Sequence, residues 1–322
     1  MTHYTVRPDV AAFLQALRES EVPSFEGLTI EEARGGLSAI CDTVDDGETP
    51  LAVKRDFQAE VPGQGVPVRL YDRRVGRQAG PLIVFYHGGG FVGGNLDSHD
   101  AFCVYLADQM DMPVLSVDYR LAPEHPFPAA LDDAEAVTRW AADSPALLGF
   151  EVTGLITCGD SAGGNLALVV GQKLALRPAT APLLAQWALY PLVSGDWDWP
   201  SMRELGEGYM ATEAVLRWFM QQYGAPADDP RYACLSGEIP ADVPLLVHTA
   251  ELDPLRDQGR AYAAKAQAAG TPTWQLESSG QIHGFATMRK TLPSAQGDVD
   301  AFIEAAKATD RNTIQNLQSP HC

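Results

Sequence analysis

Basic side chains are scarce in this sequence of 322 residues. Lysine and arginine together number 23, whereas aspartate and glutamate number 42, so the formal net charge at pH 7 is −19. A chain this acidic repels nucleic-acid phosphates and anionic membrane surfaces. We therefore expect neither nucleic acid nor a membrane as a partner.

Cysteine is sparse too. No cluster of His, Cys and carboxylate side chains has metal-ligand spacing, and no G-x-G-x-x-G fingerprint lies in a βαβ unit. The odd number and irregular spacing of the cysteines argue against a disulfide framework. We expect reduced thiols, no metal and no cofactor. The five cysteines are Cys41, Cys103, Cys158, Cys234 and Cys322.

Long hydrophobic runs are absent. No stretch approaches the roughly 18 apolar residues of a membrane span. The N-terminal residues 1–9 lack the basic region and apolar core of a secretory signal. We therefore expect a cytoplasmic protein. The sequence is compatible with a homodimer but contains no signal for one.

Short apolar runs such as 82–86 alternate with longer amphipathic segments from residue 66 onward. Such alternation predicts an α/β fold with a mostly parallel central sheet flanked by helices. The alternation breaks in an aromatic-rich, helical stretch. We expect an N-terminal cap segment at 1–60, a catalytic domain at 61–190 and 238–322, and a helical cap insertion at 191–237.

The pattern G-x-S-x-G occurs once, at 159–163, between an apolar run and helix-forming residues. Strand, sharp turn and helix are the context of the nucleophile elbow, which exposes its serine at the top of the sheet. The pattern predicts Ser161 as the nucleophile. The Ala162 amide would then lie at a helix N-terminus, where negative charge on a bound carbonyl develops.

A second glycine-rich motif, His87-Gly88-Gly89-Gly90, directly follows the apolar run 82–86. It matches the HGGG type of oxyanion loop in lipases and esterases, and glycines let backbone N–H groups approach a carbonyl without a Cβ in the way. We expect the amides of Gly88, Gly89 and Ala162 to be the oxyanion donors. His87 and Gly90 would support the loop.

A serine hydroxyl needs a base at neutral pH, and histidine is the usual one. Among seven histidines, His283 is the best placed because it follows a strand-like segment and precedes a C-terminal helix. His248 lies inside an apolar run and is interpreted as a core residue. His99 and His125 lie in loops and are interpreted as structural or surface residues.

The third member must be a carboxylate between the serine and the histidine in chain order, at the end of a strand. Asp253 follows the apolar run 244–250 and meets this condition. Glu251 and Asp257 are rivals, since a shift of two or four residues would bring either one to the histidine.

Together these motifs resemble the hormone-sensitive-lipase family of bacterial esterases, in its GDSAG branch, and acetyl esterases within it. The resemblance spans residues 66 to 305. It implies an α/β-hydrolase fold with a helical cap, a small-molecule ester of short to medium acyl chain as substrate, and Asp253 as the third triad member. The matching segments are 87–91, 118–124 with 127–130, 159–165, 253–257 and 283–285.

Other functions use the same elements. An amidase or formamidase would employ the same triad but must protonate a poorer leaving group. A noncatalytic ligand-binding protein on the same fold is a second alternative, which the presence of Ser161, Asp253 and His283 disfavours. A peptidase is less favoured, because the sequence offers no additional segment long enough for a propeller domain. A long-chain lipase is also less favoured.

Overall fold

An eight-stranded sheet forms the centre of the computed structural model, which describes residues 4–20, 27–41 and 51–318, with side chains as far as residue 309. The strand order is β1-β2-β4-β3-β5-β6-β7-β8. β2 pairs antiparallel with β1 and β4, and the other neighbours are parallel. The strands are β1 Val53–Val61, β2 Gln64–Asp72, β3 Ala79–Tyr86, β4 Val114–Val117, β5 Glu151–Asp160, β6 Leu183–Leu189, β7 Leu245–Leu252 and β8 Thr273–Ile282.

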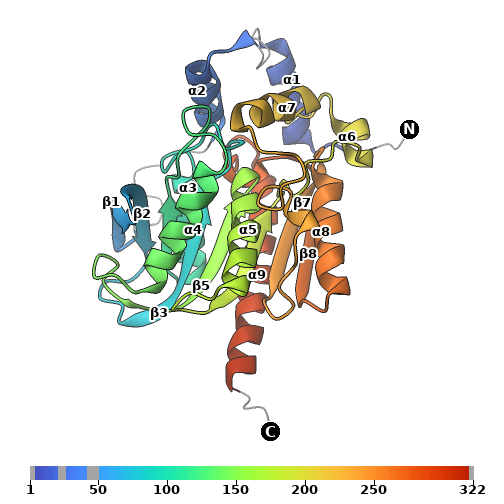
Figure 1. Cartoon of the computed structure of the whole chain (residues 1–322). Helices are drawn as coiled ribbons and strands as arrows, with labels where there is room; N and C mark the ends of the chain where they lie inside the picture. The colour runs from blue at the N-terminus through green and yellow to red at the C-terminus, as the bar shows by residue number, and fades with distance from the viewer. Residues whose placement is uncertain (1–3, 21–26, 42–50, 319–322) are drawn as a thin grey trace.

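Helices cover both faces of the sheet (Figure 1). Along β3, Leu82, Val84 and Tyr86 belong to one core cluster, with residues of α4, α5 and α8, whereas Ile83 and Phe85 belong to the other, with α3 and α9. Successive side chains of a strand point to opposite faces, so an unbroken apolar run is buried on both sides. These helices are α3 Asp100–Met110, α4 Ala129–Ala142, α5 Ala162–Leu176, α8 Arg256–Ala268 and α9 Ala295–Gln318.

Four further helices lie over the end of the sheet at which the parallel strands finish (Figure 1). α1 Pro8–Glu19 and α2 Ile30–Ile40 come from the N-terminal segment, while α6 Pro200–Leu205 and α7 Glu213–Tyr223 come from the insertion between β6 and β7. α2 begins with a capping box, in which Thr29 and Glu32 satisfy each other's backbone N–H groups. None of the helices described here is long and apolar enough to cross a membrane.

The sheet begins earlier than the sequence predicts. β1 starts at Val53, inside the segment 1–60 assigned to the cap. It is an edge strand whose nine residues are mostly polar and mostly not buried, so it lacks the apolar run by which the inner strands are identified. The predicted stretches 1–3, 21–26 and 42–50 of the cap segment lie outside the described residues.

Candidate active site

The turn between β5 and α5 holds Ser161 in an unusual backbone conformation, with φ 55° and ψ −118°. Positive φ is rare for a residue with a side chain and persists only where the surroundings enforce it. Here a Cβ atom on Gly159 or Gly163 would collide with backbone oxygen atoms, so the turn closes only around these two glycines. The Ser161 N–H donates to Leu189 O at 2.9 Å, which ties the turn to β6.

Two hydrogen bonds connect the serine to a buried carboxylate. His283 Nε2 lies 2.8 Å from Ser161 Oγ, and His283 Nδ1 lies 2.7 Å from Asp253 Oδ2. Asp253 is fully buried, and its other oxygen accepts the Leu255 N–H at 2.8 Å. The structure thus brings the three predicted residues together from the ends of β5, β7 and β8.

The rival carboxylates face elsewhere. Glu251 accepts hydrogen bonds from Ser279 Oγ and the Gly280 N–H. Asp257 accepts from the Ser201 N–H and from Arg256. Both acids are therefore engaged away from His283.

The electrostatics of His283 suit a base. Burial disfavours the imidazolium and lowers the pKa of His283, but the charge of Asp253, its hydrogen bond and the charge of Asp160 outweigh burial, so the net shift is upward. His87 shows the opposite balance, because burial and the neighbouring His99 lower its pKa to about 3. His87 is thus neutral near pH 7, whereas His283 is poised to accept a proton.

Each carbonyl at the start of the glycine loop has a donor. The His87 carbonyl accepts the Tyr119 hydroxyl at 2.6 Å, and the Gly88 carbonyl accepts His87 Nδ1 at 2.8 Å. The Gly89 carbonyl accepts the N–H of Val92 and of Gly93. Because a trans peptide points its C=O and N–H in opposite directions, fixing the carbonyls of Gly88 and Gly89 also fixes the N–H of the residue that follows each.

One N–H group that the sequence predicts as an oxyanion donor already has an acceptor within the protein. The N–H of Gly88 donates to Asp160 Oδ1 at 2.7 Å and so is already used within the protein. The N–H groups of Gly89, Gly90 and Ala162 donate to no carbonyl or side chain in the described part of the chain. Among the described residues, the Gly90 N–H, which the sequence assigned to support of the loop, is thus left without a protein acceptor, whereas the Gly88 N–H has one.

A cavity of about 420 Å³ opens above these groups. Ser161, His283 and the glycine loop form its floor, and apolar side chains from the cap form its walls. Such a largely apolar pocket with a few convergent polar groups is typical of small-molecule sites. Prominent wall residues are Leu28, Leu37, Ile40, Leu216, Phe219 and Met220.

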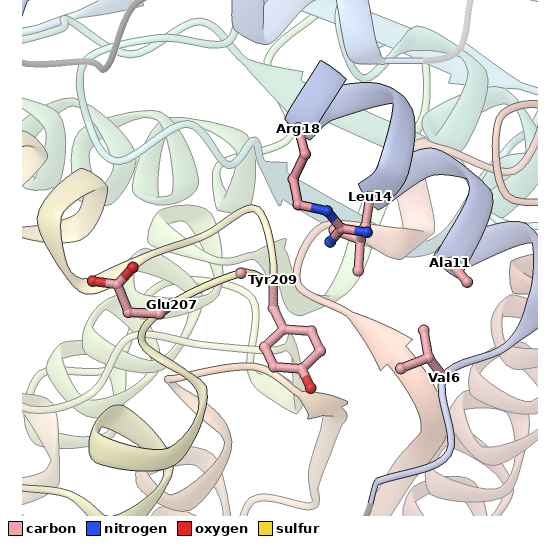
Figure 2. A pocket seen from close by; sticks show the side chains of 7 residues that line it. Val6, Ala11, Leu14, Arg18, Glu207 and Tyr209 are labelled. Carbon is pink, nitrogen blue, oxygen red and sulfur yellow. The ribbon is translucent and has the colours of Figure 1, made fainter. Parts of the chain in front are cut away.

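A second, smaller hollow of about 290 Å³ lies between α1 and the loop that precedes α7. Figure 2 shows Leu14 and Arg18 of α1 on one side and Glu207 and Tyr209 of the loop on the other. Its lining contains no serine, cysteine or histidine. It therefore lacks the serine and histidine pair found in the larger cavity.

The sequence does not predict the contacts of His99, which was interpreted as a structural or surface residue. His99 is buried, and its Nε2 lies 3.0 Å from Asp160 Oδ1. Its only signal in the sequence is a position shortly before a helix, 62 residues ahead of the elbow, and that signal does not reveal the contact. Asp160 was likewise treated as an unspecified position of the elbow motif.

Comparisons with known proteins identify the family of this chain. Residues 83–287 match the α/β-hydrolase fold family. The ethyl acetate hydrolase of Pseudomonas putida is 34% identical over 94% of this chain and 98% of its own. The carboxylic ester hydrolase LipN of Mycobacterium tuberculosis is 36% identical over 91% of this chain and 81% of its own.

Solved structures of esterases share this fold. An esterase of Pyrobaculum calidifontis superposes with a TM-score of 0.82 at 29% identity, covering 95% of this chain and 99% of that one. A thermostable esterase of Pseudomonas putida superposes with a TM-score of 0.86 at 26% identity, covering 96% and 98%. The predicted fold and family are thereby confirmed, and the chain is a member of the α/β-hydrolase fold family, in its hormone-sensitive-lipase group of esterases.

Proposed function

We propose that this protein hydrolyses small carboxylic esters of short to medium acyl chain through an acyl-enzyme on Ser161. The observation that carries the proposal is the unbroken hydrogen-bond chain from Ser161 through His283 to Asp253, which lies beneath an apolar pocket. Ethyl acetate hydrolase, the name of a relative that matches nearly the whole chain, supports a short acyl group.

In the first half-reaction, Ser161 Oγ attacks the ester carbonyl carbon while His283 Nε2 accepts the hydroxyl proton. The resulting imidazolium then donates this proton to the departing alcohol oxygen, and the C–O bond to the alcohol breaks. Asp253 remains ionised, holds the imidazole tautomer and stabilises the imidazolium. In the second half-reaction, water attacks the acyl carbon while His283 accepts its proton, the bond to Ser161 Oγ breaks, the carboxylic acid leaves, and Oγ regains the proton from His283.

The negative charge on the carbonyl oxygen is stabilised by the N–H groups of Gly89, Gly90 and Ala162. Loss of one such donor typically costs about 2.7 to 4 kcal/mol of transition-state stabilisation. Three preorganised donors therefore account for a large part of the rate acceleration. Their positions depend on the carbonyl contacts of the loop, which are made before substrate arrives.

The pocket supports an uncharged acyl group. Its walls are mostly apolar, so an alkyl chain gains about 0.8 kcal/mol per buried methylene. A cavity of about 420 Å³ also limits how many methylenes can be accommodated. Ester length should therefore have an optimum.

The test is hydrolysis of p-nitrophenyl esters from acetyl to dodecanoyl, with the matching anilides, by the wild type and by Ser161→Ala. We expect rapid turnover of the shorter esters, poor turnover of anilides and loss of activity in the variant. Faster anilide turnover would favour an amidase. A folded wild type that hydrolyses neither class would overturn the proposal and favour a binding protein.

A further inference from the structure

Asp160 is buried directly behind the nucleophile and has no part in the mechanism above. Its Oδ1 accepts the Gly88 N–H at 2.7 Å. A Cβ atom on Gly88 would lie 2.5 Å from Asp160 Oδ2, so the carboxylate packs against this residue only because it is glycine. The elbow and the oxyanion loop are therefore joined through one side chain.

His99 approaches the same carboxylate from a third segment, the turn before α3. Its Nε2 lies 3.0 Å from Asp160 Oδ1 and 3.2 Å from the Gly88 N, and its Nδ1 lies 2.9 Å from Ser98 Oγ. Asn95 Oδ1 accepts the N–H of Ser98 and of Asp97, which fixes the turn. The imidazole is thus held on both sides within a buried site.

A buried carboxylate requires this support. Burial raises the pKa of Asp160, but the charge and hydrogen bond of His99, together with the Gly88 N–H, outweigh it, so the pKa is lowered and Asp160 is ionised. An uncompensated negative charge beside the oxyanion donors would oppose the charge that develops during the reaction. The contacts of Asp160 with His99 and with the Gly88 N–H compensate its burial.

We propose that His99 is a positioning residue for ester hydrolysis, which acts through Asp160 to hold the oxyanion loop in register with Ser161. The inference rests on the proposed function of the triad. Asp160 anchors the N–H of Gly88 while His87 anchors its carbonyl, so the two peptides on either side of the Gly88 Cα are both held, and the second of them carries the Gly89 N–H. Without His99, the buried carboxylate turns toward a new partner and releases the loop.

Two substitutions of His99 distinguish the loss of its contact with Asp160 from a simple loss of packing. His99→Ala removes the donor to Asp160, whereas His99→Gln retains an N–H donor near the position of Nε2. With p-nitrophenyl butyrate, we expect His99→Ala to lower kcat about 10- to 100-fold with KM changed less than about threefold, since a misaligned loop costs somewhat less than a lost donor. His99→Gln should recover most of this loss.

A trifluoromethyl ketone with a butyl chain provides a readout specific to the oxyanion site. Ser161 Oγ adds to the ketone carbon, its proton passes to His283, and the ketone oxygen becomes an oxyanion facing the three amides. The inhibition constant in His99→Ala should rise by the same factor by which kcat falls. Inhibition by butyramide, a neutral ground-state analogue, should stay within about twofold.

His248→Gln is the matched control, because His248 is also buried and also pairs with one serine hydroxyl, Ser278. It should keep kcat within about threefold at an equal folded fraction. The inference is overturned if His99→Ala retains kcat, if its loss lies in KM, or if His99→Gln is as inactive as His99→Ala. If His99→Ala does not fold, the inference is tested instead by comparing kcat of His99→Gln with kcat of Asp160→Asn. If Ser161→Ala kept the esterase activity of the wild type, the proposed function itself would be refuted.

Discussion

The phenyl ring of Phe219 lies directly against Gly90: a Cβ atom on Gly90 would be 2.6 Å from Cδ1 of the ring and closer still to Cγ. Phe219 belongs to α7 of the cap insertion, whereas Gly90 belongs to the oxyanion loop. One side chain therefore both forms a wall of the pocket and restrains a proposed oxyanion donor. The cap and the catalytic loop are packed as one unit.

Gly90→Ala should lower kcat about 100-fold or more, because the clash with Phe219 displaces the Gly90 N–H from the oxyanion. Gly90 also has φ +63°, which favours glycine. Gly76→Ala is the matched control, because Gly76 has φ +68° with nothing within 4 Å of a Cβ atom. Steady-state kinetics measure kcat of both variants. A Gly90→Ala enzyme with normal kcat would refute the proposal that the Gly90 N–H is an oxyanion donor.

Phe219→Ala should shift the preference toward longer acyl chains. Removing the ring enlarges the pocket beside the glycine loop, so longer chains gain buried area while short chains lose contacts. We expect the ratio of kcat/KM for p-nitrophenyl dodecanoate to that for the butyrate to rise about tenfold. Phe57→Ala, on the β1 edge, removes the same side chain far from the pocket and should leave this ratio unchanged. An unaltered ratio in Phe219→Ala would show that the acyl chain lies elsewhere.

The three residues of the proposed triad could be located from the sequence because each one carries a local signal. Ser161 lies in a strand, turn and helix motif, and Asp253 and His283 follow strand-like runs whose carboxyl ends meet at one edge of a parallel sheet. Chain order then assigns the roles. The glycine loop was found for the same reason.

The direction in which each peptide of the glycine loop points could not be predicted from the sequence. Gly88 and Gly90 occupy similar positions in the motif. They are distinguished only by tertiary contacts, namely that of the Gly88 N–H with Asp160 and that of the Gly89 carbonyl with the Val92 N–H. The contact of His99 with Asp160 was not predicted because the two residues are far apart in the chain. These features depend on tertiary contacts, as does the polar edge strand β1.

Asp253→Asn should change the pH profile as well as the rate. The base must be neutral to accept the serine proton, so the raised pKa of His283 places the acid limb of kcat/KM above the ordinary histidine value of about 6.5. Without the carboxylate charge, burial dominates and the pKa falls, so the limb moves to lower pH. The rate should drop roughly 10⁴-fold, because the tautomer is no longer fixed. An acid limb that stays in place in Asp253→Asn would show that another group titrates.

Arg34 should couple the cap helix α2 to the oxyanion loop. Its guanidinium donates to the carbonyls of Val92 at 2.7 Å and Ala122 at 3.0 Å, and it also pairs with Glu124. Arg34→Met leaves two carbonyls without this donor, which costs about 1 to 3 kcal/mol of unfolding free energy for each group that stays dry. We expect a lower unfolding midpoint and about a tenfold fall in kcat/KM, since the loop loses a support next to Gly93.

Glu124→Gln separates the salt bridge from the carbonyl contacts of Arg34. The carboxylate is about half exposed, with a relative side-chain exposure of 54%, and exposed pairs contribute only about 0.2 to 1 kcal/mol. This variant should therefore keep nearly normal stability and activity, while Arg34→Met loses both. Urea unfolding and ester kinetics of the two variants measure the difference. Equal effects would mean that Arg34 acts through Glu124 alone, and that α2 is not coupled to the loop through the carbonyls of Val92 and Ala122.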